Sequence, residues 1–392
     1  MKNKFATWVN FVILIVIAMN LTIISPLLES IRHSFSLSIS QSGLIFTFNF
    51  VGFVVFVLIG GMIADRFGKK PVLLSALSAF TLLLFVFPYS PNYPVLCLIM
   101  FLIGGFGGIV ESMTMAAVSD LNPQNSGFYV NLSQVFFGVG AIVGPILAGL
   151  VVSSGLSWRV CYIGLGILSI CLTAALVICK IPKAVSDRGF SPADLKYCLK
   201  DVRFLLVCVC MLLYTGSEVG GWGWLCTLLK QKYSFGASMS SIAVAVFWGG
   251  MTIGRLICGS LTLRFKTRDL IIFLSVGSAV VTALSCFISS NVAIWAIIAC
   301  MGLTYSSQYP LLVSFGDSHS SVPSGTSFAT MMGSGGVGSM IIPYLMGVIG
   351  SASTMSAAML LPAVMLLLIG VIFIAYMKEP KTGKPSEIRK PA

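Results

Sequence analysis

Two glutamates of this sequence lie where a charge is difficult to accommodate. Glu111 falls near the middle of the apolar segment 95–118, and Glu218 near the middle of the segment 203–228. A carboxylate at the centre of a bilayer is so costly that it normally faces a polar cavity and acts there. Burial brings a carboxyl into the range where it can load and release a proton, so both residues are candidate proton-coupling groups. The alternative is a glutamate that stays protonated and donates a hydrogen bond between helices.

Polar and aromatic side chains in other apolar segments could complete a binding site for a small molecule. Trp222 lies one helical turn from Glu218, and an indole offers a flat apolar face with one N–H donor, which suits the C–H face of a sugar. The same residue types also gather at membrane interfaces, and amides also join helices, so these alternatives stay open. The candidate substrate-binding residues are Asn20, Glu111, Gln134, Glu218, Trp222, Trp224, Tyr305, Gln308 and Tyr309.

This candidate set carries carboxyls and amides but no fixed cation, which predicts a neutral polyol as the ligand rather than an anion. Arg255 is a basic residue inside an apolar segment, within two turns of that segment's end. We interpret it as a side chain that snorkels to the membrane surface or pairs with a loop acid.

The composition excludes several classes of protein. Of 392 residues, 57% are hydrophobic and only 9% are charged, whereas a soluble domain is about 25% charged. A soluble enzyme, a nucleic-acid-binding protein and a disordered scaffold are therefore excluded. The eleven cysteines form no C-x-x-C pair and have no metal-ligand cluster around them, so we expect free thiols and no metal. Without a nucleophile elbow or a phosphate loop either, we expect no enzyme and no cofactor beyond a coupling proton.

Twelve segments are long and apolar enough to cross a bilayer as helices. Only the connection 180–202, at mid-chain, is long and polar. The predicted fold is an all-α polytopic membrane protein with a six-helix bundle at 1–179, a cytoplasmic linker at 180–202, a second six-helix bundle at 203–377 and a tail at 378–392. The twelve segments are 6–28, 42–64, 71–88, 95–118, 128–152, 160–179, 203–228, 238–262, 269–288, 292–315, 325–349 and 356–377.

The basic residues predict the orientation of the spans. With the N-terminus inside, 19 of the 24 Lys and Arg residues fall in inner segments and 4 in outer loops. This bias follows the positive-inside rule and puts both termini in the cytoplasm. The net charge of +12 is then a topology signal and not a nucleic-acid footprint. We expect a multi-pass protein of the plasma membrane, a bacterial inner or cell membrane, that functions as a monomer.

The two halves repeat each other at an offset of 198 residues. Under this offset Glu218 falls on Asn20, and Glu111 falls next to Gln308. Two six-helix halves in parallel repeat, with a site between them near the midplane, are typical of secondary transporters that rock between two states. The matching positions are Gly61 with Gly259, Ser126 with Ser324, Gly127 with Gly325, Gly138 with Gly336, Gly140 with Gly338 and Pro145 with Pro343.

One loop carries a family resemblance. The sequence Gly61-Met-Ile-Ala-Asp65-Arg66-Phe-Gly68-Lys69-Lys70 resembles the signature loop between spans 2 and 3 of the major facilitator superfamily. The resemblance implies a cytoplasmic latch between the halves; a plain positive-inside loop would explain its basic residues but not the order of its residues. A second copy at 259–266 has Leu263 in place of the acid. The predicted gating residues are Gly61, Asp65, Arg66, Gly68, Lys69 and Arg264.

A narrower resemblance concerns spans 4, 5, 7 and 10. The stretches 104–111, 131–134, 214–222 and 302–310 are similar to the fucose-permease branch of sugar–proton symporters. In that branch a Glu in span 4 and an acid in span 1 are the key carboxylates. Glu111 matches the first, whereas Asn20 stands where the second would be. The resemblance also implies that spans 1, 4, 7 and 10 line a central cavity, so we expect Asn20, Glu111, Glu218 and Gln308 to lie at one depth.

These observations favour a secondary active transporter that couples the uptake of a neutral sugar or polyol to protons by alternating access. Because Asn20 does not titrate, we expect Glu111 to carry the proton and Glu218 chiefly to bind substrate. The alternative is a proton-coupled exporter, an antiporter of drugs or amphipathic metabolites, whose larger cavity the many Phe and Met residues would permit. A non-transporting receptor is disfavoured by the repeat and by the two intramembrane acids.

Overall fold

The computed structural model describes residues 2–181, 201–262, 264–319 and 324–377, and the regular structure of these residues is helical. Twelve helices or helix pairs are long and apolar enough to span a membrane, which confirms the predicted fold class. The N-terminal half contains α1 (Lys2–Thr22), α2 (Ile24–Ser34), α3 (Ile39–Phe67), α4 (Lys69–Val86), η1 (Phe87–Tyr89), α5 (Tyr93–Leu121), η2 (Pro123–Asn125), α6 (Ser126–Ser153) and α7 (Arg159–Ile178).

The C-terminal half repeats this order of spans. It contains α9 (Val202–Gly223), α10 (Leu225–Tyr233), α11 (Ala237–Leu261), α12 (Thr267–Phe287), α13 (Ala293–Tyr305), α14 (Gln308–His319), α15 (Ser324–Ala352), α16 (Met355–Ala358) and α17 (Leu360–Tyr376). The predicted tail 378–392 and most of the predicted linker 180–202 lie outside the described residues. The domain boundaries between them stay a prediction.

Local sequence explains where several helices begin and end. The Ser38 side chain accepts a hydrogen bond from the Gln41 N–H while the Gln41 side chain accepts one from the Ser38 N–H, which is a capping box at the start of α3. Asn92 caps α5 through the N–H of Val95. Gly68 ends α3 with a φ of 90°, a left-handed conformation that a side chain would strain.

Four predicted single spans are broken into two helices, which the sequence prediction did not include. Proline removes the N–H that would bond the carbonyl four residues earlier. Pro26 follows the end of α1 at Thr22 by four residues, Pro310 follows the end of α13 at Tyr305 by five, and Pro362 follows the end of α16 at Ala358 by four. The break in span 7, at Trp224, instead follows a glycine-rich stretch.

The two halves meet along seams of small residues. α3 packs on α15 and α6 packs on α11. Gly43 of α3 lies against the backbone of residues 343 and 344, and Gly149 of α6 lies against Ser241 of α11. A Cβ atom at either glycine would approach the partner helix closely, so these positions let the backbones come together.

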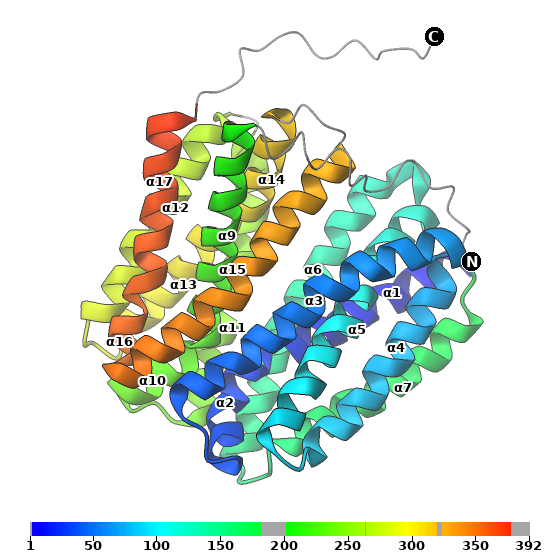
Figure 1. Cartoon of the computed structure of the whole chain (residues 1–392), viewed down its shortest axis with the longest axis horizontal. Coiled ribbons are helices and arrows are strands. Elements are labelled where there is room, and N and C mark those ends of the chain that lie inside the picture. The colour runs from blue at the N-terminus through cyan, green and yellow to red at the C-terminus, as the bar shows by residue number, and fades with distance from the viewer. Residues whose placement is uncertain (1, 182–200, 263, 320–323, 378–392) are drawn as a thin grey trace.

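The halves are joined at one end and diverge at the other. We name the end that carries Lys4 and the Gly68 turn the terminal end, and the end that carries α2 and α10 the opposite end. Three hydrogen bonds join the halves toward the opposite end: Ser25 Oγ donates to Trp222 O at 2.9 Å, Ser40 N to Ser351 Oγ at 3.1 Å, and Thr47 Oγ1 to Met340 O at 2.6 Å. Figure 1 shows α3 and α15 closer together near α2 and α10 than at their terminal ends.

Candidate functional site

Glu111 lies on a face of α5 that glycines bring close to its neighbours. Gly104 packs against the backbone of Asn49, and Gly108 packs against Phe53, both on α3. Gly107 faces Phe80 of α4. Glu111 follows one turn later, deep in the protein but with part of its surface accessible. Deep placement with residual exposure is expected for a side chain in the wall of a cavity.

Glu218 is the intramembrane acid of the C-terminal half and lies on α9. Gly216 and Gly220 pack α9 against α15, and Tyr214, one turn before Glu218, is completely buried. Glu218 itself is deep in the protein and partly accessible, and its carboxyl lies beside the Tyr214 hydroxyl. The second intramembrane acid therefore also combines a deep position with partial accessibility.

Tyr309 lies near charged groups of both halves. This residue lies in the first turn of α14, is partly accessible, and is within electrostatic range of Glu111, Glu218 and Arg255. Glu111 comes from the N-terminal half and the other residues from the C-terminal half. Tyr309 is therefore within range of one acid from each half, and the predicted cavity shared by the two acids stays a prediction.

Arg255 belongs to this region, and its predicted placement was wrong. Its Nε donates a hydrogen bond to the carbonyl of Ser306 at 3.2 Å, and its Nη2 lies 3.5 Å from the Met251 sulfur. Its charge acts on Glu218. Arg255 thus reaches inward to the break between α13 and α14, not outward to the membrane surface. Among the described residues, Arg255 is therefore a fixed cation of this region.

The tryptophans of α9 and α11 form an aromatic wall next to Glu218. The Trp222 ring lies 6.1 Å from the ring of Phe46 and 6.1 Å from that of Trp248. Among the described residues, the buried Nε1 of Trp248 has no hydrogen-bond partner, so it can donate to a ligand. Trp224 differs because its Nε1 already donates to the carbonyl of Pro343 at 2.9 Å. Sequence reasoning missed Trp248, although it lies seven residues before Arg255, on the same face of one helix.

Span 10 contributes two residues that are already bonded inside the C-terminal half. The Gln308 Oε1 accepts from Ser275 Oγ at 3.0 Å, and its Nε2 donates to Ser278 Oγ at 2.8 Å. The Tyr305 hydroxyl pairs with Thr282 Oγ1 at 3.0 Å. In this conformation both side chains are engaged with α12, and a role for either in ligand binding stays a prediction.

The remaining predicted binding residues have free capacity or weak partners. The buried Oδ1 of Asn20 has no hydrogen-bond partner in the part of the chain that the structure describes. Gln134 makes only a 3.5 Å contact between its Nε2 and the sulfur of Met115, which joins α6 to α5. Asn20 therefore retains an acceptor for a ligand, whereas Gln134 lies between two helices of its own half.

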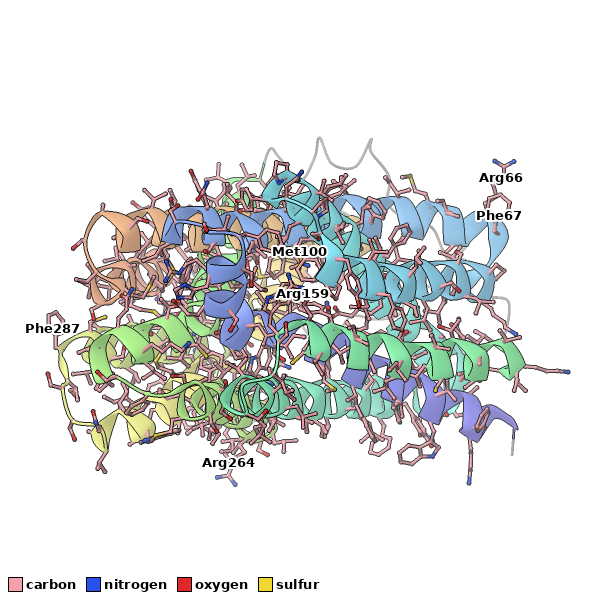
Figure 2. All side chains as sticks on the ribbon, turned by 90° about the horizontal axis from the view of Figure 1, so that it is seen from below. Arg66, Phe67, Met100, Arg159, Arg264 and Phe287 are labelled. Carbon is pink, nitrogen blue, oxygen red and sulfur yellow. The ribbon has the colours of Figure 1, made fainter. Side chains whose placement is uncertain are left out.

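The predicted gating residues lie at the terminal end. Lys69 Nζ binds Asp120 Oδ2 at 2.5 Å, so the acid that pairs with this loop comes from the end of α5, a partner that the sequence did not indicate. Figure 2 shows Arg66 and Arg264 projecting from different halves, well apart from each other. Gly61 has open space beside it. The side chain of Asp65 is outside the described residues.

Comparison with known proteins identifies the family. The model of the Major Facilitator Superfamily matches residues 11–335. The chain belongs to this superfamily. Its family and structural neighbours are transporters and not enzymes, and it is a multi-pass membrane protein.

Several relatives match most of the chain at low identity. A "Protein TsgA homolog" of Buchnera aphidicola is 22% identical over 356 residues, 90% of this chain and 89% of that protein. The "Glucose/galactose transporter" of Brucella abortus is 23% identical over 360 residues, 86% of each chain. The "Cis,cis-muconate transport protein" of Acinetobacter baylyi is 21% identical over 393 residues, 96% of this chain and 94% of that protein.

Solved structures support the same fold. A D-xylose–proton symporter superposes with a TM-score of 0.80 at 14% identity, covering 97% of this chain and 99% of that one. The fucose:proton symporter of E. coli superposes with a TM-score of 0.67 at 18% identity, covering 97% of this chain and 100% of that one. At such identities the likeness concerns the fold.

Proposed function

We propose that this transporter couples the uptake of a neutral sugar or polyol to protons in the plasma membrane, with both termini in the cytoplasm. The observation that supports the proposal is that Glu111 and Glu218, one from each half, both lie within electrostatic range of Tyr309. Sugar symporters among the structural neighbours and a glucose/galactose transporter among the relatives support the substrate class.

The residues of the site suggest a division of roles. Glu111 carries the proton, because its surroundings on α5 are glycines and apolar side chains. Glu218 and the Trp248 indole bind hydroxyl groups, and the Trp222 ring supports the apolar face of the sugar. In the proposed orientation the terminal end faces the cytoplasm, so the joined opposite end and the diverging terminal end correspond to an inward-facing state of the cycle.

Two assays on Glu111→Gln in vesicles test this function. Gradient-driven uptake needs net proton movement, whereas counterflow exchanges substrate without it. We expect the variant to lose uptake and keep counterflow, and Glu218→Gln to weaken both. Glu29→Gln, which changes a carboxyl of α2 outside the spans, is the matched control. Accumulation of substrate by Glu111→Gln against its gradient would contradict the assignment.

A second substrate class is favoured by Arg255. A guanidinium in the cavity can bind a carboxylate in a bidentate manner, and one relative is named as a cis,cis-muconate transport protein. A thermal-shift screen of the purified protein distinguishes the classes, because a ligand that binds the native state raises its Tm. Neutral hexoses and polyols should raise the Tm. A rise with small carboxylates alone would assign an anionic substrate, and a rise with cationic dyes alone would favour the drug exporter.

A further inference from the structure

The break in span 10 leaves a carbonyl without its helical donor. In a continuous helix the Ser306 carbonyl would accept from the N–H of residue 310, but that residue is Pro310, which has none. A buried carbonyl needs a partner. Arg255 supplies it from α11, with its Nε 3.2 Å from the Ser306 oxygen. The guanidinium therefore replaces the hydrogen bond that the proline removes.

The neighbouring carbonyl receives a donor from the helix that carries Glu218. The Tyr214 hydroxyl of α9 donates to the Tyr305 carbonyl at 2.8 Å. Tyr214 lies one turn before Glu218, and the carboxyl of Glu218 is beside its hydroxyl. Two consecutive carbonyls at the break are thus bonded from two different helices. These two hydrogen bonds bring Arg255 of α11 and Tyr214, one turn before Glu218 on α9, to the same break.

The titratable and charged groups that act on the tyrosines of this break come from six helices. They are Glu218 and Tyr214 from α9, Arg255 from α11, Cys286 from α12, Tyr305 from α13, Tyr309 from α14 and Glu111 from α5. The tyrosines and the thiol are neutral, so this set contains two carboxyls and one guanidinium. It is electrically neutral when the two carboxyls share one proton. A buried charge without a counter-charge is strongly destabilising.

We propose that Arg255 is a positioning residue that ties Glu218 to the break in span 10. It bonds the Ser306 carbonyl that Pro310 leaves without a donor, and it is the counter-charge of an ionised Glu218. Glu111 is then the group that holds the single proton. This assignment of the proton rests on the proposed proton coupling, whereas the pairing of Arg255 with Glu218 does not. Because α14 begins at the break and carries Tyr309, a change of charge at Glu218 is transmitted to the wall of the cavity.

A thermal-stability cycle on the purified protein tests the counter-charge. Arg255→Gln keeps a donor for Ser306 but loses the charge, and we expect its Tm to fall by several degrees. Arg255→Lys keeps the charge and should retain most of the Tm. The double variant Glu218→Gln/Arg255→Gln should regain at least half of the loss, because a neutral Glu218 position needs no counter-charge. Arg264→Gln, an exposed arginine of the same half, should leave the Tm unchanged.

A second pair of variants tests the bond to the carbonyl. Arg255→Met removes both donor and charge, and Pro310→Ala returns an N–H to the position that faces Ser306. Both variants also carry Glu218→Gln, which removes the charge effect. The variant with Arg255→Met and Pro310→Ala should then have a higher Tm than the variant with Arg255→Met alone. An equal Tm for the two would show that Arg255 has no role as a donor at the break.

Each outcome bears on a separate claim. If the doubly neutral variant is no more stable than Arg255→Gln, or if Arg255→Lys is as unstable as Arg255→Gln, Arg255 is not the counter-charge of Glu218. These measurements need neither substrate nor a proton gradient. Failure of proton coupling in the Glu111→Gln assay would therefore leave the pairing standing, and failure of the pairing would leave proton coupling to be judged by that assay.

Discussion

Removing the hydrogen bonds between the halves at the opposite end should shift the balance between the two states of the cycle. The triple variant Ser25→Ala/Thr47→Val/Ser351→Ala deletes the three side chains that make these bonds. Hydrogen bonds between membrane helices contribute about 0.6 kcal/mol each on average, so the three together contribute about 2 kcal/mol. That energy corresponds to a change of roughly 25-fold in an equilibrium constant. A minor state populated at about 2% would rise to roughly one third.

The distance between two spin labels at the terminal end measures this shift. Leu58 of α3 and Phe328 of α15 are 47% and 44% exposed and suit labels carried on noncanonical residues, because the native cysteines would react with thiol labels. We expect the variant to gain a population at shorter distance, since opening of the opposite end accompanies closure of the terminal end.

A matched control separates this effect from a general loss of stability. Thr81→Val removes a buried hydroxyl that contacts Ser169 Oγ at 2.6 Å, within the N-terminal half alone. The control should lower the Tm without changing the distance distribution. If the triple variant also lowers the Tm and leaves the distances unchanged, these bonds do not hold the opposite end closed and the reasoning is wrong.

Three further predictions concern stability. Burial opposes ionisation of Glu29, yet the hydrogen bond and charge of Arg32 hold its pKa below 4.5. The ionised Glu29 therefore stabilises the folded state above that pH, and this contribution is lost as the pH falls. We expect Glu29→Gln to flatten the decline of Tm below about pH 4.5. Asp120→Asn leaves Lys69 without its partner and should reduce the free energy of unfolding by about 1 kcal/mol, measured by denaturant titration. Gly338→Ala would bring a Cβ against a backbone carbonyl of α9 and should lower the free energy of unfolding by about 1–3 kcal/mol. Thermal unfolding measures this loss, with Gly333→Ala, at a position with open space, as the control.

The spans could be predicted because hydropathy is a local property, but the breaks within them could not. Pro26, Pro310 and Pro362 each follow a point where a helix ends, whereas Pro145 and Pro343 lie inside the continuous helices α6 and α15. A proline therefore does not decide by itself whether a helix breaks. The outcome depends on donors and packing from other helices, which are distant in sequence.

The candidate site was predictable where a charge interrupts an apolar run. Glu111 and Glu218 are conspicuous for that reason, and both reach the region around Tyr309. The role of Arg255 was missed because its partner, the Ser306 carbonyl, lies 51 residues away and is released only by the break. For an amide such as Gln308 the sequence gives a depth but not the direction in which the side chain points.

The short helices α2 and α10 have a consequence for the bilayer around the protein. They contain 11 and 9 residues, and each is separated by a break from the long helix before it, so the opposite end can open by displacement of small segments. The helices α3 and α15, which diverge at the terminal end, and α6 and α11, which form the second seam, run unbroken over their described lengths, so closing that end requires whole helices to tilt. Tilting changes the area that the protein occupies in one leaflet, and it works against lateral pressure there. Lipids that stiffen that leaflet should therefore slow one half of the cycle much more than the other.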